Sequence, residues 1–275
     1  MPSHDGSGTH LRFAKFPKQA AKECFKVANA CFCTRQRRRA FACLPKQMHS
    51  SRRHQNSNRK KEIMDTAKAA LKRLRDGNRR FVADVRNPDN ASSHARRSEI
   101  AAGQEPFAII LGCSDSRVPA ELVFDQGLGD LFVIRVAGNI VAPSQVGSVE
   151  FAADRYRTKL VVVLGHSQCG AILATLDELK RPSENQSRNL KSIVDRIRPS
   201  IETLMETELK HDHDALVHQS VRANIRASVN HLRHGSEILE SLSQNEGLLV
   251  VGAEYSLETG EVEFFDGLPA NFSFD

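Results

Sequence analysis

The sequence lacks any apolar run long enough to cross a lipid bilayer. A transmembrane helix needs about twenty consecutive, mostly apolar residues. No stretch of the 275 residues approaches that length. We therefore expect a soluble chain without a membrane span, and functions that require one are excluded.

Acidic residues are almost missing from the first sixty residues. Only two precede Glu62, whereas basic residues abound and include the run Arg37–Arg39. No strand pattern is visible there, and the cysteines of this segment lack the two-pair spacing of a zinc site. They are Cys24, Cys31, Cys33 and Cys43. We therefore predict a basic, disordered extension at residues 1–61 and one α/β catalytic domain at residues 62–275.

Three origins of this basic extension remain open. An Arg-rich, acid-poor composition is typical of an organelle transit peptide. A basic disordered tail could also bind nucleic acid or an anionic surface. Alternatively, translation in the cell could begin at Met64, immediately before a predicted helix. In each case we expect the domain to keep its function when residues 1–61 are deleted.

Two thiols and one imidazole follow two buried strand patterns. Cys113 comes after the apolar stretch at 107–111, and His166 and Cys169 come after the stretch at 160–164. Short, continuous apolar runs that end at Gly are typical of strands in a parallel sheet. Ligands bind at the carboxyl ends of such strands. We therefore expect these three side chains to meet at one sheet edge.

The number of ligands indicates the kind of metal site. A structural zinc site normally has four protein ligands, whereas a catalytic site has three and leaves a position for water. A single buried cysteine is usually only a small apolar residue, and a lone histidine is usually structural. The matched positions of Cys113, His166 and Cys169 make a metal site the better interpretation. Hydrolytic or hydration chemistry follows from an open zinc site.

The spacing within each run supports this interpretation. His166 and Cys169 are three residues apart at a strand-to-helix turn, so they face the same way. The helix N-terminus would favour a thiolate at Cys169. If the other run stays extended, Cys113, Asp115 and Arg117 project to one side. Asp115 and Arg117 could form an ordinary ion pair, but such pairs also support metal ligands.

The remaining pattern predicts the fold. Apolar periodicities predict an α/β fold with a mainly parallel central sheet flanked by helices and a C-terminal antiparallel hairpin. Polar residues at 87–96 predict turns, and Pro199 should bend or divide its helix. The predicted helices lie at 65–81 (with Asp65 as N-cap), 148–156, 190–204 and 217–232, and the further strands at 131–136, 248–252 and 262–265.

Two other groups of residues suggest binding sites but have simpler interpretations. His211, His213 and His218 lie in a polar setting, so we expect them on the solvated surface. Gly127 and Gly129 superficially suggest a phosphate-binding loop, but no strand–loop–helix pattern surrounds them.

Three motifs together resemble the β-class carbonic anhydrases. They are Cys113–Glu121, Gly129–Asn139 and Gly165–Ala171, and the similarity runs from about Ala67 to the C-terminus. The resemblance implies a β-carbonic-anhydrase-like fold and a carbonate dehydratase with one Zn²⁺ per subunit. Zinc-bound hydroxide would convert carbon dioxide reversibly to bicarbonate and a proton. It also implies a homodimer or a dimer of dimers.

The resemblance assigns roles to individual residues. It makes Cys113, His166 and Cys169 the zinc ligands, and Asp115 and Arg117 the catalytic pair. Asp115 could orient the zinc-bound hydroxide, or it could become a fourth ligand in a closed-site state. Both alternatives stay open at this point.

Two features depart from parts of the family. One subgroup has a non-catalytic bicarbonate site built on a Trp, and this chain contains no Trp. Plant-like members place a pocket Gln directly before a Pro-Gly pair. Here Gly127 takes that place and Gln126 lies one residue earlier.

Two rival functions share this scaffold. One is hydrolysis of carbon disulfide or carbonyl sulfide, and the other is a non-catalytic zinc-binding paralogue. The presence of both Asp115 and Arg117 counts against the paralogue. Because Cys113 and Cys169 must remain reduced to bind metal, we expect the cytoplasm, or an organelle stroma or matrix if residues 1–61 are a transit peptide.

Overall fold

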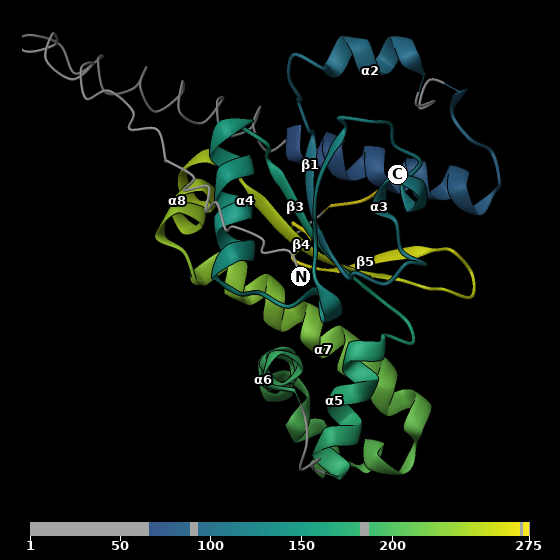
Figure 1. Cartoon of the computed structure of the whole chain (residues 1–275), viewed down its shortest axis with the longest axis vertical. Helices are drawn as coiled ribbons and strands as arrows, with labels where there is room; N and C mark the ends of the chain where they lie inside the picture. The colour runs from purple at the N-terminus through teal and green to yellow at the C-terminus, as the bar shows by residue number, and fades with distance from the viewer. Residues whose placement is uncertain (1–65, 89–92, 182–186, 270–271, 275) are drawn as a thin grey trace, which may run out of the picture. The chain divides into compact units, whose positions relative to one another are not determined.

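The computed structural model describes residues 66–88, 93–181, 187–269 and 272–274. Predictions for residues 1–61 and for Asp65 lie outside this part of the chain. Its central element is a five-stranded sheet of order β2-β1-β3-β4-β5 (Figure 1). The strands are β1 Ala108–Gly112, β2 Leu131–Arg135, β3 Leu160–His166, β4 Leu249–Tyr255 and β5 Val262–Asp266.

The sheet is parallel except at one edge. β1 pairs in parallel with β2 and β3, and β3 pairs in parallel with β4. Only β5 is antiparallel, and it pairs with β4. The predicted mainly parallel sheet with a C-terminal antiparallel hairpin is therefore confirmed.

Helices cover both faces of this sheet. One helix occupies residues 66–82, close to the predicted 65–81. The others are α2 His94–Ile100, α3 Ala120–Val123, η2 Ala137–Asn139, α4 Pro143–Arg155, α5 Gly170–Lys180, α6 Arg188–Ile201, η3 Glu202–Glu206, η4 Glu208–His211, α7 His213–His234 and α8 Glu237–Glu246. Among these described helices, none is both long and apolar enough to cross a membrane.

The sequence pattern missed or misplaced some helical ends. Part of the predicted turn region at 87–96 forms the start of α2, because the Ser93 side chain accepts a hydrogen bond from the backbone N–H of Arg96. α6 continues through Pro199 and ends two residues later, at Ile201. A proline removes only one backbone donor, and in the last turn this loss does not divide the helix. No helix was predicted for α8.

Alternate strand residues face two apolar layers. Ile109 and Val161 pack with side chains of α4 to α8 on one face. Ile110 and Val162 pack with the helix at 66–82 and with α3 on the other face. Figure 1 shows α4, α7 and α8 gathered along one side of the sheet. Because both faces are covered, the central strands β1 and β3 are buried along their whole length.

The pairing of β1 with β3 positions the two candidate ligand segments. Gly112 at the end of β1 lies beside Leu164 of β3. Cys113 directly follows Gly112, and His166 is the last residue of β3. The two runs therefore leave the same edge of the sheet from adjacent strands.

Candidate metal centre

Three metal-binding side chains converge at this sheet edge. Across the described residues, Cys113, His166 and Cys169 form the one group of three or more Cys, His or acidic residues whose ligand atoms all lie within 4.8 Å of one another. The two Sγ atoms are 4.0 Å apart. The three residues are only 5%, 0% and 1% exposed. The structure thus brings the predicted ligands together in a buried cluster.

The segment after β1 turns sharply instead of remaining extended. The backbone N–H of Val118 donates to the carbonyl of Asp115, 3.1 Å away. The N–H of Arg117 donates to Oδ1 of Asp115 at 3.0 Å. The segment does not stay extended, which was the condition for Cys113, Asp115 and Arg117 to project to one side. An Asp side chain readily bonds to the backbone two residues ahead and forms a turn.

This turn folds the Arg117 guanidinium back onto Asp115. Nε donates to Oδ1 at 2.9 Å and Nη2 donates to Oδ2 at 2.7 Å. These bonds hold the pKa of Asp115 well below its usual range. Oδ2 also lies 3.9 Å from Nε2 of His166. An ionised carboxylate is therefore held beside the ligand cluster.

Arg135 fixes the backbone of the same segment from the neighbouring strand. Its guanidinium donates to the carbonyls of Cys113 at 3.0 Å and Asp115 at 2.6 Å. Sequence reasoning missed this residue. Arg135 reaches this segment because β1 and β2 pair in parallel, which places Arg135 beside Gly112.

The imidazole of His166 is oriented by the next residue in the chain. Its Nδ1 lies 2.8 Å from the carbonyl of Ser167. A carbonyl can only accept, so Nδ1 carries the proton and the Nε2 lone pair is free. Nε2 is buried and has no hydrogen-bond partner within the described part of the chain. An unpartnered buried nitrogen beside two thiols fits a metal ligand.

Cys169 lies at the N-terminus of α5. It is the N-cap residue, and its side chain makes no capping hydrogen bond. The backbone N–H groups of Ala171 and Ile172 at the start of the helix favour a lower pKa of the Cys169 thiol. The neighbouring Cys113 opposes them more strongly.

Each of the paired thiols changes the pKa of the other. Their mutual hydrogen bond is the largest contribution to the pKa of Cys113, which falls to about 4. The same bond raises the pKa of Cys169, because its ionisation would place two anions 4.0 Å apart. A divalent cation between the sulfurs would favour ionisation of both.

Comparison with known proteins shows which family the chain belongs to. The sequence profile of the family described as carbonic anhydrase matches residues 108–262. Carbonic anhydrase 2 of Mycobacterium tuberculosis is 36% identical over 199 residues, which cover 72% of this chain and 92% of the relative. The chain belongs to the carbonic anhydrase family. The predicted resemblance is confirmed.

Solved structures agree with this assignment. The β-carbonic anhydrase CcaA matches with a TM-score of 0.58 and 27% identity, over 72% of this chain and 95% of that chain. Two tetrameric β-carbonic anhydrases are known from Sordaria macrospora, and the structural match to them has a TM-score of 0.55 at 24% identity. It covers 61% of this chain and 84% of that chain, and shows the shared fold.

The carbonic anhydrase fold anchors the His166 segment to the β4–β5 hairpin through Ser167, a residue that sequence reasoning missed. The N–H of Ser167 donates to the carbonyl of Tyr255 at 2.9 Å. Its hydroxyl donates to Glu258 at 2.8 Å and accepts from the N–H of Leu257 at 2.9 Å. Ser167, whose carbonyl orients His166, therefore makes three hydrogen bonds to one hairpin.

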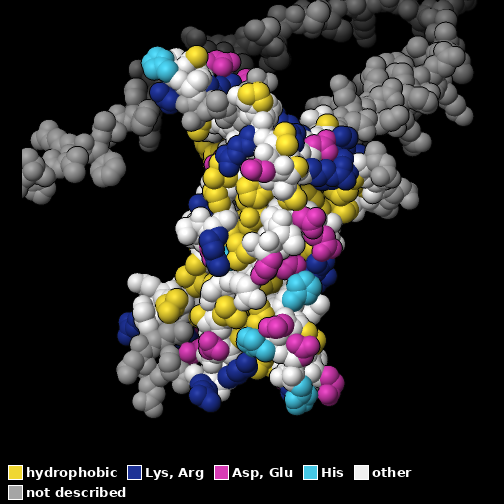
Figure 2. Space-filling view, turned by 90° about the vertical axis from the view of Figure 1, so that its right-hand side faces the viewer, with side chains coloured by type: hydrophobic (Ala, Val, Ile, Leu, Met, Phe, Trp, Pro, Cys, Tyr) yellow, Lys and Arg dark blue, Asp and Glu magenta, His cyan; other side chains and the backbone are white. Residues whose placement is uncertain are grey.

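The other candidate residues predicted from the sequence lie apart from the ligand cluster of Cys113, His166 and Cys169. His211, His213 and His218 are exposed, as predicted. His218 lies 3.4 Å from Glu254. Figure 2 shows histidine and acidic side chains together on the lower part of one face. These histidines belong to no metal-binding group among the described residues.

The region around Gly127 offers neither of the two sites considered from the sequence. The buried amide of Gln126 donates to the carbonyl of Phe124 at 2.7 Å, so it supports the backbone. The glycines at 127 and 129 lead into β2 and not into a helix. A phosphate-binding loop needs a helix N-terminus at that point.

Proposed function

We propose that this chain is a zinc-dependent carbonic anhydrase that interconverts carbon dioxide and bicarbonate. The observation that carries the proposal is the buried cluster of Cys113, His166 and Cys169 within the matched carbonic anhydrase region. The cluster supplies three ligands, which leaves one position of a tetrahedral site open. An open position is what a hydration reaction requires.

The donor atoms of this cluster suit zinc. Thiolate and imidazole are zinc's preferred ligands, whereas calcium and magnesium prefer oxygen. Cys113 and Cys169 would bind through Sγ, and His166 through the unpartnered Nε2. When bound, zinc lowers the pKa of a coordinated water enough to make hydroxide available near neutral pH.

Asp115 and Arg117 form the catalytic pair in this proposal. Arg117 keeps the carboxylate ionised and fixes its position through two hydrogen bonds. Oδ2 of Asp115, next to the ligand cluster, can accept a hydrogen bond from the reacting water and orient it. Both carboxylate oxygens are already bonded to Arg117. A role of Asp115 as a fourth ligand would compete with the 2.7 Å bond from Nη2.

An assay of one preparation tests this function. Metal analysis should find one zinc per chain, and stopped-flow measurement should find rapid hydration of carbon dioxide. A zinc-loaded protein with no hydration activity would support the non-catalytic paralogue. No observation supports hydrolysis of carbonyl sulfide or carbon disulfide, so neither gas should be turned over faster than carbon dioxide.

We also propose that the chain assembles as a dimer or a dimer of dimers. β2 is an edge strand of the sheet, so its outer backbone groups are open to pairing. An aromatic cluster of Phe132, Phe151 and Tyr156 lies nearby, and Phe151 is 53% exposed. Exposed aromatic side chains are enriched at protein interfaces. Light scattering should therefore give at least twice the monomer mass.

The proposed location is a reducing compartment. Cys113 and Cys169 are free thiols, and metal binding requires that they stay so. The cytoplasm meets this condition, and so does an organelle stroma or matrix. Microscopy of the full chain beside a chain lacking residues 1–61 would distinguish them. Binding of nucleic acid by residues 1–61 has no support beyond their charge.

A further inference from the structure

A short turn next to the ligand cluster contacts one of its two thiols. The N–H of Gly138, in η2, donates a hydrogen bond to Sγ of Cys113, 3.3 Å away. Hydrogen bonds to a ligating sulfur stabilise the thiolate and tune its strength as a ligand. The position of this peptide therefore matters for the metal centre.

The backbone of this turn has an unusual conformation. Gly138 and Asn139 have φ angles of +70° and +43°. Two consecutive residues in the left-handed region are unfavourable, especially when one is not glycine. At Gly138 a side chain would also collide, because an added Cβ would lie 2.8 Å from Cδ1 of Ile197 and 3.0 Å from Cβ of Ala171. Such a turn persists only when its surroundings hold it.

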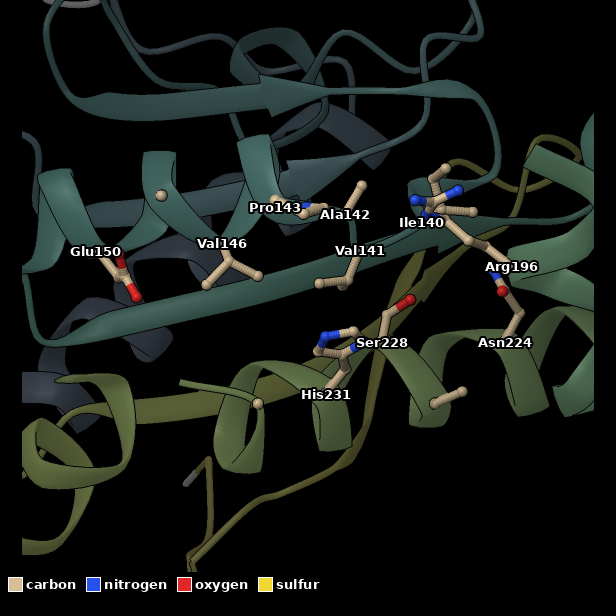
Figure 3. A pocket seen from close by; sticks show the side chains of 13 residues that line it. Ile140, Val141, Ala142, Pro143, Val146, Glu150, Arg196, Asn224, Ser228 and His231 are labelled. Carbon is tan, nitrogen blue, oxygen red and sulfur yellow. The ribbon is translucent and has the colours of Figure 1, made fainter. Parts of the chain in front are cut away.

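Two side chains of α7 hold the carbonyls of the turn. Nδ2 of Asn224 donates to the carbonyl of Gly138 at 2.8 Å, and the hydroxyl of Ser228 donates to the carbonyl of Asn139 at 3.0 Å. The two residues are one helical turn apart and only 2% and 5% exposed. Figure 3 shows both pointing from α7 toward the segment that leads into Ile140.

Neither residue contacts a metal ligand directly. Their effect would pass through the turn, because fixing both carbonyls also fixes the orientation of the Gly138 N–H. The other thiol has a different arrangement, since Cys169 is the N-cap residue of α5. The residues at a helix N-terminus are held in place by the backbone hydrogen bonds of their own helix. The turn behind Cys113 depends on α7 instead.

We infer that Asn224 and Ser228 are positioning residues that hold the Gly138 N–H against the Cys113 thiolate and so set its strength as a metal ligand. This inference rests on the proposed function, because it assumes that Cys113 binds zinc. It extends the site to two residues of α7 that lie more than fifty positions beyond Cys169 in the sequence.

Cobalt substitution gives a readout that a merely structural role would not change. Thiolate-bound Co²⁺ has a sulfur-to-metal charge-transfer band in the near ultraviolet. Loss of the N–H bond raises the energy of the sulfur electrons, so the band should move to longer wavelength. We expect this shift in Ser228→Ala, and in Asn224→Asp at a pH high enough to ionise the introduced carboxyl, which then cannot donate.

Zinc affinity is the second readout. Changes to groups that support a metal ligand typically weaken binding on the order of 10-fold to 100-fold. Competition with a chelator should show a loss of this size in both variants. Ser228→Thr keeps a hydroxyl donor and should restore both the band and the affinity. Both side chains border a cavity of about 610 Å³, which gives a modest replacement room.

Ser220 provides the matched control. It lies four residues before Asn224 on α7, is fully buried, and its hydroxyl has no hydrogen-bond partner among the described residues. Ser220→Ala should therefore leave the cobalt band and the zinc affinity unchanged. It reports any effect that comes only from changing a buried polar residue of this helix.

The outcomes separate this inference from the proposed function. If the unchanged chain binds zinc and hydrates carbon dioxide, but folded Asn224→Asp and Ser228→Ala match it in both readouts, the inference is overturned and the function stands. A shift of equal size in Ser220→Ala would also overturn it. If the unchanged chain binds neither zinc nor cobalt, the proposed function fails and this inference fails with it. Should Asn224→Asp not fold, Ser228→Ala and Ser228→Thr decide alone.

Discussion

The two segments that carry the candidate ligands are built in opposite ways. The β3 segment, residues 166–169, is fully buried at His166 and Cys169 and is held by a helix on one side and a hairpin on the other. The β1 segment, residues 113–117, begins with a buried thiol and ends at Arg117, whose side chain is 54% exposed. The first segment supplies only ligands, whereas the second also brings a charged pair to the edge of the site.

This difference indicates that the β3 segment serves to bind the metal, whereas the β1 segment also takes part in the reaction. The ligands of the β3 segment are fixed by main-chain geometry, which tolerates little movement. In the β1 segment, side chains fix one another through the turn at Asp115. Substitutions of His166 or Cys169 in the β3 segment should therefore remove the metal, and those at Asp115 or Arg117 should leave the metal and slow the reaction.

The largest effect is expected for His166→Ala. Loss of one of three ligands should remove zinc, and hydration activity should fall on the order of 10³-fold or more because no activated water remains. Zinc content and stopped-flow hydration measure both. His213→Ala changes an exposed histidine and serves as the control. Full zinc content in His166→Ala would break the comparison.

A large effect without metal loss is expected for Asp115→Asn. The amide cannot accept a proton or pair with Arg117 as a carboxylate does, so turnover should fall roughly 10²-fold. Zinc content should stay at one per chain. Asp154→Asn, at a largely exposed position, is the control. Unchanged turnover would remove Asp115 from the mechanism.

The sequence predicted the converging ligands because their positions depend on strand ends, which apolar runs reveal. It did not predict the turn at Asp115. An alternating pattern is compatible with an extended segment, and only the bond from the Arg117 N–H to Asp115 shows that the chain turns. Contacts between distant elements were also missed. Arg135 and Ser167 reach the site through strand pairing and a hairpin that local pattern does not specify.

The dependence of activity on pH should come from the metal centre and not from the charged pair. Two thiolates cancel the charge of the dication, so water is acidified less than by a site of three imidazoles. Activity should therefore rise from pH 6 to pH 9. The lowered pKa of Asp115 keeps its carboxylate ionised throughout this range.

The same lowered pKa makes stability depend on pH only in acid. The pair of Asp115 with Arg117 stabilises the fold above the usual carboxyl pKa, and this contribution is lost as the pH falls through the lower value of the folded state. Asp115→Asn should thus lower the stability at neutral and alkaline pH and weaken the dependence of stability on pH in acid. A flat rate profile between pH 6 and pH 9 would contradict the expected role of the thiolates.

A smaller effect is expected for Ser167→Ala, which weakens the anchor of the β3 segment. The substitution removes the side-chain bonds to Glu258 and Leu257, and the free energy of unfolding should fall by about 1 kcal/mol. Activity should drop a few-fold because the Ser167 carbonyl that orients His166 is held less firmly. Ser144→Ala, at an exposed position of α4, is the control. Equal melting temperatures for both variants would refute the anchor.

The smallest effect is expected for deletion of residues 1–61. All candidate ligands and the Asp115–Arg117 pair belong to residues 113–169, so hydration activity and zinc content should remain within about twofold. Assays of the full chain and the deletion under the same buffer conditions measure this. An inactive or insoluble deletion would show that the extension supports one of the two ligand segments.

The burial of Cys113 and Cys169 links the cation to the integrity of the whole domain. Both thiols belong to the larger apolar layer beneath α4 to α8, and they lie 56 residues apart in the chain. A bound cation would fasten the end of β1 to the start of α5 from inside that layer. Stripping it with a chelator should loosen both elements together and lower the temperature of a single, shared unfolding transition.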